Sequence, residues 1–139
     1  MAALASTISG VLLLLSLLHV YWALGGRRGR AVGVPEVGDR PLFAPTPLAT
    51  LGVALGLAAA ALVVATRARL WTASPVPAPL ASWGTLVLAA VFIGRAIGDF
   101  RFVGFTKRVR RSRFARWDTR LYSPLCAALG FGMLWLAAR

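Results

Sequence analysis

The sequence predicts an all-α protein, a four-helix bundle integral to a membrane, with both termini on the non-cytoplasmic side. Three observations lead to this prediction: an unusually apolar composition, four separate apolar segments, and an uneven distribution of arginine between the segments that join them. The chain has 139 residues, of which 58% are hydrophobic, and a mean hydropathy of +0.73. Soluble domains are roughly half apolar, so this composition is typical of a membrane protein. The length suits a single membrane domain covering residues 1–139.

Four apolar segments are each long enough to cross a bilayer, which requires about 20 residues in a helix. Thr46 followed by Pro47 is typical of an N-cap with proline at the first helical position, so the second helix should begin there. The start of the fourth helix stays open between two N-caps, Thr119 and Ser123. No basic region precedes the first segment, so we expect it to be retained rather than cleaved as a signal peptide. The expected spans are residues 3–24, 47–66, 80–98 and 121–138.

Basic residues are concentrated in two of the connecting loops, residues 25–46 and 99–120. These loops hold twelve of the 16 basic residues, and Arg95 lies within the third span. The other side of the bundle has three, namely Arg67, Arg69 and Arg139. The positive-inside rule therefore places both loops in the cytoplasm and both termini outside. The twelve are Arg27, Arg28, Arg30, Arg40, Arg101, Lys107, Arg108, Arg110, Arg111, Arg113, Arg116 and Arg120.

Small residues recur at intervals of four in the later spans, which places them on one face of each helix and lets backbones approach closely in lipid. We expect these stripes to form seams inside the bundle, and a homodimer face is the alternative. In the first span one side carries small and polar residues, and we expect it to face the bundle interior. The stripes are Gly52, Gly56 and Ala60; Ala90, Gly94 and Gly98; Cys126 with Gly130; and Ala128 with Gly132. The side of the first span carries Ala5, Ser9, Ser16, His19 and Ala23.

All four acids and the only histidine are predicted to lie in one layer at the cytoplasmic boundary. His19 and Arg95 each precede the end of a span by about five residues, roughly 7 Å inside that boundary. One interpretation is a functional pocket, since ionisable groups within spans usually face the bundle or a water-filled cavity. The other is a structural network, in which Arg95 pairs with Asp99 one turn later, and Asp118 caps the fourth helix or meets an arginine of the third loop. The candidate polar cluster is His19, Glu36, Asp99 and Asp118, with Asp39 beside it.

The segment Lys107–Arg116 has six cationic groups in ten residues. Such runs often bind nucleic acid, but this one lies between two spans and is held at the membrane, so we expect no nucleic-acid partner. Juxtamembrane basic clusters attract anionic lipid at about 1 kcal/mol per residue. A topology signal without a bound ligand is the alternative. The neighbouring aromatic residues Phe100, Phe102, Phe105, Phe114 and Trp117 should enter the interface. Candidate anion or lipid contacts are Arg40, Arg95, Arg101, Lys107, Arg108, Arg110, Arg111, Arg113 and Arg120.

Residues suited to catalysis or metal binding are scarce. A single cysteine, Cys126, excludes a disulfide within the chain and a cysteine-based zinc site, and we expect neither a metal nor a cofactor. No activated nucleophile or phosphate loop is visible. We therefore expect a non-catalytic inner-membrane protein that binds anionic lipid, a partner protein or a second copy of itself. The alternative is a membrane enzyme or carrier, in which Arg40, Arg95, Arg101 and Arg120 hold a lipid or phosphorylated substrate and His19, Asp99 or Asp118 moves protons.

Three stretches also resemble a known family: HVYWALGG at 19–26, RPLFAPTPLATLGVALGL at 40–57, and RAIGDFRFVGFTKRVRRSRFARWDTRLYSPLC at 95–126. They resemble the bacterial membrane-protein family catalogued as domain of unknown function 3995. The resemblance covers nearly the whole chain, and the third stretch is its most specific part. It implies a small integral membrane protein of four helices. It implies no activity and assigns no role to any residue.

Overall fold

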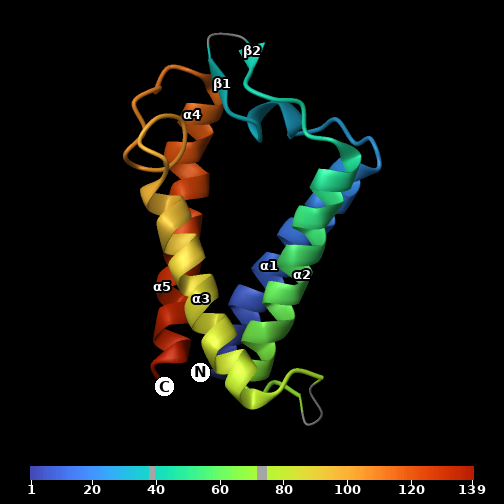
Figure 1. Ribbon diagram of the computed structural model, residues 1–139, viewed down its shortest axis with the longest axis vertical. Helices are drawn as coiled ribbons and strands as arrows, with labels where there is room; N and C mark the ends of the chain where they lie inside the picture. The colour runs from blue at the N-terminus through green and yellow to red at the C-terminus, as the bar shows by residue number, and fades with distance from the viewer. Residues whose placement is uncertain (38–39, 72–74) are drawn as a thin grey trace.

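The computed structural model describes residues 1–37, 40–71 and 75–139, and it is dominated by helices (Figure 1). Asp39, expected beside the polar cluster, lies outside the described residues. A short hairpin interrupts the loop between the first two long helices, and in it Glu36 lies opposite Pro41 and Val37 opposite Arg40. In chain order the elements are α1 (Ala2–Ala23), η1 (Arg30–Val32), β1 (Glu36–Val37), β2 (Arg40–Pro41), α2 (Pro47–Arg67), α3 (Ala78–Ile97), α4 (Arg113–Trp117), η2 (Asp118–Tyr122) and α5 (Ser123–Ala137).

Four helical segments are long and apolar enough to cross a membrane, as predicted: α1, α2, α3 and the continuous rod Arg113–Ala137. The N-cap of α2 is confirmed, because Thr46 Oγ1 accepts a hydrogen bond of 3.2 Å from the Ala49 N–H. The predicted start of the fourth helix is wrong. Ser112 caps it instead, seven residues before Thr119 and eleven before Ser123, and accepts from the Ala115 N–H at 3.0 Å. The rod then continues to α5 through η2, a turn of π-helix; such turns keep a helix continuous while changing which residues share a face.

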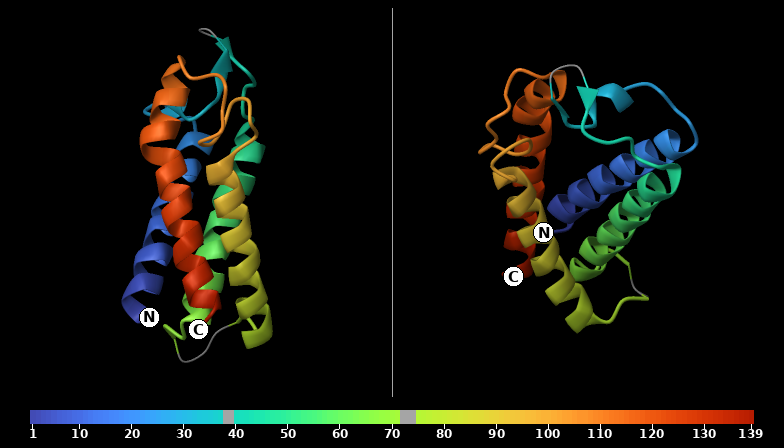
Figure 2. Two further views of the ribbon diagram at one scale, coloured as in Figure 1. Left: turned by 90° about the vertical axis from the view of Figure 1, so that its left-hand side faces the viewer. Right: turned by 45° about the horizontal axis from the view of Figure 1, so that its top comes forward.

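The long helices pack as two pairs, α1 with α2 and α3 with α5 (Figure 1). The pairs meet near the two chain termini, which we call the closed end of the bundle (Figure 2). They diverge toward the opposite, open end, where the two longer loops lie. The apolar core occupies the closed end, because its members come from the beginning of α1 and the end of α5. That core includes Ala5, Ile8, Leu12, Ala60, Ala61, Val64, Ala89, Leu129, Met133 and Leu136.

The predicted inner side of the first span is confirmed for its first three members. Ala5, Ser9 and Ser16 are buried. Ser9 Oγ donates to the Ala61 carbonyl at 3.2 Å, and Ser16 Oγ donates to the Ala54 carbonyl at 2.7 Å. Hydroxyl groups satisfied by the neighbouring backbone are a common means of joining helices in an apolar environment.

Only some of the predicted small-residue stripes lie in a seam between two helices. A Cβ at Gly130 would meet Ile93 and Ala89 of α3, so this glycine lies in a seam, as predicted. A Cβ at Gly52, Gly56 or Gly94 would meet nothing within 4 Å. The prediction that these three line seams inside the bundle is therefore wrong for the described chain, because they lie on its outer surface.

The outer surface of the long helices is apolar. No more than 33% of the residues in the most apolar stretch of any span are buried within the chain. A surface of this kind suits lipid, in which helices satisfy their own backbone and expose apolar side chains. Large exposed apolar residues on the four helices include Leu14, Leu17, Leu48, Leu55, Trp83, Val87, Val91, Phe131 and Trp135.

Candidate functional site

A buried carboxylate, Asp118, organises the open end of the α3–α5 pair. Its side chain is 0% exposed and lies on η2. Oδ1 accepts from Arg95 Nη2 at 2.8 Å, which ties it to the end of α3. Oδ2 accepts from Lys107 Nζ at 2.9 Å, from the Gly104 N–H at 2.9 Å and from Ser123 Oγ at 3.1 Å. One side chain thus joins α3, the loop 98–112 and the helical rod; we call Arg95, Gly104, Lys107, Asp118 and Ser123 the Asp118 network.

The cations of the Asp118 network correct two predictions. Lys107, expected among the lipid contacts, has a side chain only 1% exposed, and its Nζ also donates to the Gly104 carbonyl at 2.9 Å. Arg95 pairs with Asp118 rather than with Asp99, and its side chain is 33% exposed. Buried ions are costly unless paired and hydrogen-bonded, and Asp118 meets that need for both cations. Arg95 Nη1 is buried and has no hydrogen-bond partner among the described residues.

Two glycines allow the loop 98–112 to fold back on the end of α3. Gly98 and Gly104 have φ of +98° and +85°. A Cβ on Gly98 would clash with the backbone of residues 103–104, and a Cβ on Gly104 would clash with the backbone of residues 97–98. The Phe105 N–H donates to the Ala96 carbonyl at 2.8 Å, and Thr106 Oγ1 donates to the Ile97 carbonyl at 2.7 Å. Glycine adopts this backbone region without steric cost. The folded loop brings the Gly104 N–H and Lys107 to Asp118.

Asp99 has a local structural role in the same loop. Its Oδ1 accepts from the backbone N–H groups of Arg101, Phe102 and Val103 at 2.9, 2.7 and 2.9 Å. Burial acts to raise the pKa of this carboxyl, but the three backbone donors outweigh it and hold the pKa below its ordinary value. Asp99 therefore fixes the turn that follows α3, and it is not the partner of Arg95.

Glu36 connects the hairpin to the fourth helix. Its side chain is buried, and Oε1 accepts from the Arg113 N–H at 2.7 Å and from the Phe114 N–H at 3.3 Å. A carboxylate that accepts from the first N–H groups of a helix stabilises its N-terminus. Tyr122 Oη donates to the Val32 carbonyl at 3.2 Å, which makes a second connection between the two loops. The sequence placed Glu36 in the polar layer but gave no signal of this capping role.

The remaining cations of both loops are mostly on the surface. Phe100 and Trp117 lie among them and are 62% and 49% exposed, and Phe105 is also exposed. Phe114, expected at the interface, is instead buried and packs against the ring of Tyr122 with centroids 6.0 Å apart. Phe102 is half-buried, with the Arg101 guanidinium 4.9 Å from its ring centroid. The exposed predicted contacts are Arg40, Arg101, Arg108, Arg110, Arg111, Arg113 and Arg120.

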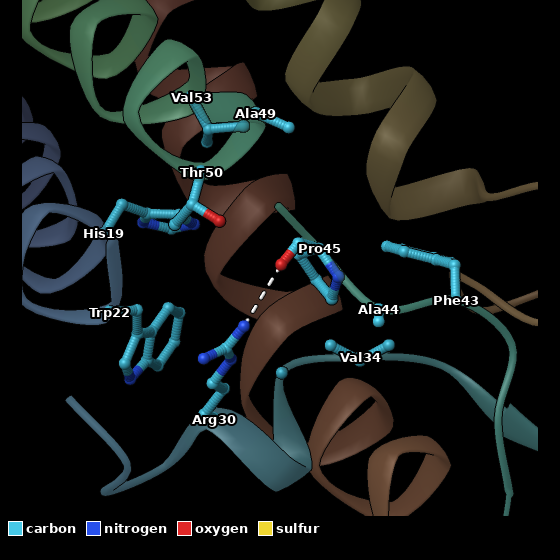
Figure 3. A pocket seen from close by; sticks show the side chains of 11 residues that line it. His19, Trp22, Arg30, Val34, Phe43, Ala44, Pro45, Ala49, Thr50 and Val53 are labelled. Carbon is cyan, nitrogen blue, oxygen red and sulfur yellow. Dashed lines mark hydrogen bonds between the residues drawn. The ribbon is translucent and has the colours of Figure 1, made fainter. Parts of the chain in front are cut away.

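His19 lies apart from the Asp118 network, in the other helix pair. Its Nδ1 is 2.8 Å from the Leu15 carbonyl, and its ring meets Trp22 edge-on with centroids 5.1 Å apart. It lines a cavity of about 400 Å³ beside Arg30 and Thr50 (Figure 3). Neither Arg95, Asp99 nor Asp118 lines this cavity. The single polar layer predicted from the sequence is thus divided between the two helix pairs.

Metal-binding groupings are absent from the residues that the structure describes, since no three His, Cys, Asp or Glu side chains gather there. Four helices long and apolar enough to cross a membrane, with both longer loops at one end, define the class of protein: a small all-helical bundle with four candidate membrane spans. Residues 12–133 match the family described as protein of unknown function (DUF3995), and the chain belongs to that family. Searches of curated proteins and of solved structures gave no significant match.

Proposed function

We propose that the protein is a non-catalytic, multi-pass protein of a bacterial inner membrane that binds anionic lipid headgroups at its cytoplasmic face. In this proposal the loops 25–46 and 99–120 lie in the cytoplasm and both termini lie outside. Twelve basic residues in those loops against three on the other side support this orientation.

The observation that supports the proposal most directly is which cations the Asp118 network pairs and which ones it leaves exposed. The network takes Lys107 into the interior and pairs Arg95, so these two cations are unavailable to a headgroup. The same fold leaves seven arginines exposed between Arg101 and Arg120, together with Phe100, Phe105 and Trp117. Exposed arginines attract anionic lipid, and aromatic side chains anchor at the headgroup level. A fixed surface that combines the two is suited to a bilayer whose inner leaflet is negatively charged.

A charge-matched pair of variants tests lipid binding. Arg108→Gln with Arg111→Gln removes two exposed charges whose side chains make no hydrogen bond among the described residues. Arg69→Gln with Arg139→Gln removes two charges from the opposite end and serves as the control. We expect the first variant to co-purify less anionic lipid than the control when lipids are quantified by mass spectrometry. Equal lipid content in the two variants would indicate that the basic loop acts only as a topology signal and does not bind lipid.

The membrane enzyme or carrier is the weaker alternative. Three groups that it would use, Arg95, Asp99 and Asp118, are engaged in contacts that hold the fold together. Association with a second copy has one supporting observation, since Gly52 and Gly56 of α2 present an unpacked small-residue surface. Native mass spectrometry of the detergent-purified protein would separate a lipid-bound monomer from a dimer by mass.

A further inference from the structure

The loop between α1 and α2 borders two adjoining cavities, each partly open to the outside, at the open end of the bundle. The first, of about 400 Å³, lies against the ends of α1 and α2. The second, of about 370 Å³, lies between the hairpin and the start of α4. Cavities of this size are at the lower end of the range that holds small ligands. The two share one wall, made of Arg30, Val34, Phe43, Ala44 and Pro45.

The first cavity is mainly apolar. Trp22 of α1, Val53 of α2 and Phe43 of the loop supply its apolar walls (Figure 3). Few polar atoms are available in it, because Thr50 Oγ1 already donates to the Thr46 carbonyl at 2.9 Å. A carbonyl can only accept, so the contact of 2.8 Å between His19 Nδ1 and the Leu15 carbonyl places the proton on Nδ1. With Nδ1 bonded to the backbone and Thr50 Oγ1 donating to Thr46, the cavity offers mainly apolar contacts to a ligand.

The second cavity is basic. Arg27, Arg30 and Arg113 line it, and Glu36 is the only acid among the lining residues that the structure describes. The Glu36 carboxylate is already engaged by two backbone N–H groups of α4. Arg30, in the shared wall, uses Nη2 to donate to the Pro45 carbonyl at 3.1 Å and retains its other donors. Among the described lining residues, three guanidinium groups face one carboxylate, which lies 4.0 Å from Arg113 Nε. This excess of positive charge favours an anion with several acceptor oxygens, such as a phosphate.

We propose that the two cavities form one site for a single anionic amphiphile. Its phosphate group would lie against Arg27, Arg30 and Arg113, and its apolar chain would lie against Trp22, Phe43 and Val53. A phospholipid with an anionic phosphodiester headgroup has this chemistry. Apart from Arg113, the site is separate from the exposed arginines between Arg101 and Arg120, so its failure would leave the proposed surface binding of headgroups to the other six untouched.

Trp22 provides a direct reporter of occupancy, because bromine on a lipid chain quenches tryptophan fluorescence on contact. The purified full chain in non-ionic detergent is titrated with short-chain phosphatidylglycerol carrying brominated chains. We expect saturable quenching that Trp22→Phe removes and Trp83→Phe, an exposed position on α3 outside both cavities, retains. Phosphatidylcholine of the same chain length should bind more weakly, and inorganic phosphate should not compete. Absence of saturable quenching, or equally strong competition by phosphate alone, would overturn the proposal.

Variants of the lining residues test the two parts of the site. Arg30→Gln should weaken phosphatidylglycerol binding roughly tenfold, the effect of losing one charge-assisted hydrogen bond. Val53→Phe should block the apolar cavity, and Leu55→Phe, which is more exposed and lines neither cavity, is its matched control. Arg108→Gln with Arg111→Gln should leave the saturable binding unchanged. An unchanged affinity in both Arg30→Gln and Val53→Phe would show that the lipid binds elsewhere and would refute the site.

Discussion

Replacing Asp118 with asparagine should be among the most damaging isosteric changes in the protein. The substitution keeps the volume of the side chain but removes its charge and turns one of two acceptor positions into a donor. Four donors converge on the native carboxylate, from Arg95, Gly104, Lys107 and Ser123. An asparagine would therefore leave at least one of them facing another donor.

The magnitude follows from the burial of the two cations. The Lys107 side chain is 1% exposed, so it would remain as an uncompensated ion in the interior, which costs about 3–5 kcal/mol. The Arg95 side chain is 33% exposed and can turn toward solvent or headgroups, so we assign it a small share of the loss. We expect the free energy of unfolding to fall by about 3–5 kcal/mol in Asp118→Asn, measured by denaturant or thermal unfolding in detergent.

A double-mutant cycle identifies the cause. Lys107→Met removes the stranded cation, so Asp118→Asn combined with Lys107→Met should be less damaging than the sum of the two single changes by about 1–3 kcal/mol. Asp99→Asn is the matched control. All three backbone donors bind the single oxygen Oδ1 of Asp99, and an asparagine retains an equivalent carbonyl oxygen. Asp99 is also exposed, so the loss of its charge should cost little. Strictly additive losses, or equal losses at Asp99 and Asp118, would refute the reasoning.

Three further outcomes can be checked. A C-terminal alkaline phosphatase fusion should be active and a C-terminal green fluorescent fusion dark, because the arginine distribution places the terminus outside, and the reverse pattern would invert the orientation. Gly130→Ala should lower thermal stability by about 1–3 kcal/mol, because its Cβ would lie 2.7 Å from Ile93 Cγ1 and 2.9 Å from Ile93 N. Gly94→Ala, with nothing within 4 Å, should be neutral or slightly stabilising, and equal effects would contradict the assigned packing. Because the pKa of Asp99 is lowered on folding, its contribution is present at neutral pH and is lost as the pH falls through that lowered pKa. Asp99→Asn should flatten the acid side of a stability–pH profile, and an unchanged profile would count against the three backbone contacts.

The helices could be predicted because their signals are local and additive. Span length and apolar composition require no knowledge of a partner, and the cap at Thr46 depends on residues within one turn. The start of the fourth helix was missed because the charged residues from Arg113 to Arg120 lie inside a helix that projects beyond its apolar part. The sequence has no signal for the π turn that keeps this helix continuous.

The partner of Arg95 could not be predicted, because it depends on a long-range fold. The i, i+4 rule favoured Asp99, which is near in sequence, whereas Asp118 is 23 residues away and becomes available only when the loop folds back. The positive φ of Gly98 and Gly104 makes that fold possible, and glycine alone does not reveal it. The lone lysine does mark this burial: every other Lys or Arg position is arginine, and among the described residues Lys107 is the one cation whose side chain is almost fully buried.

The separation of His19 from Arg95 follows from how the helices pair. Each lies near the loop end of its helix, so sequence position alone suggests that they share a layer. Because α1 packs on α2 and α3 packs on α5, and the pairs diverge toward that end, the two side chains belong to different units. Apolar contacts hold the pairs together at the closed end, whereas at the open end the hydrogen bonds of Glu36 and Tyr122 join the loop 25–46 to the fourth helix. The Asp118 network therefore belongs to one pair and the cavity with His19 to the other. This is why ion pairing at Arg95 is compatible with the lipid binding proposed beside His19 in so small a chain.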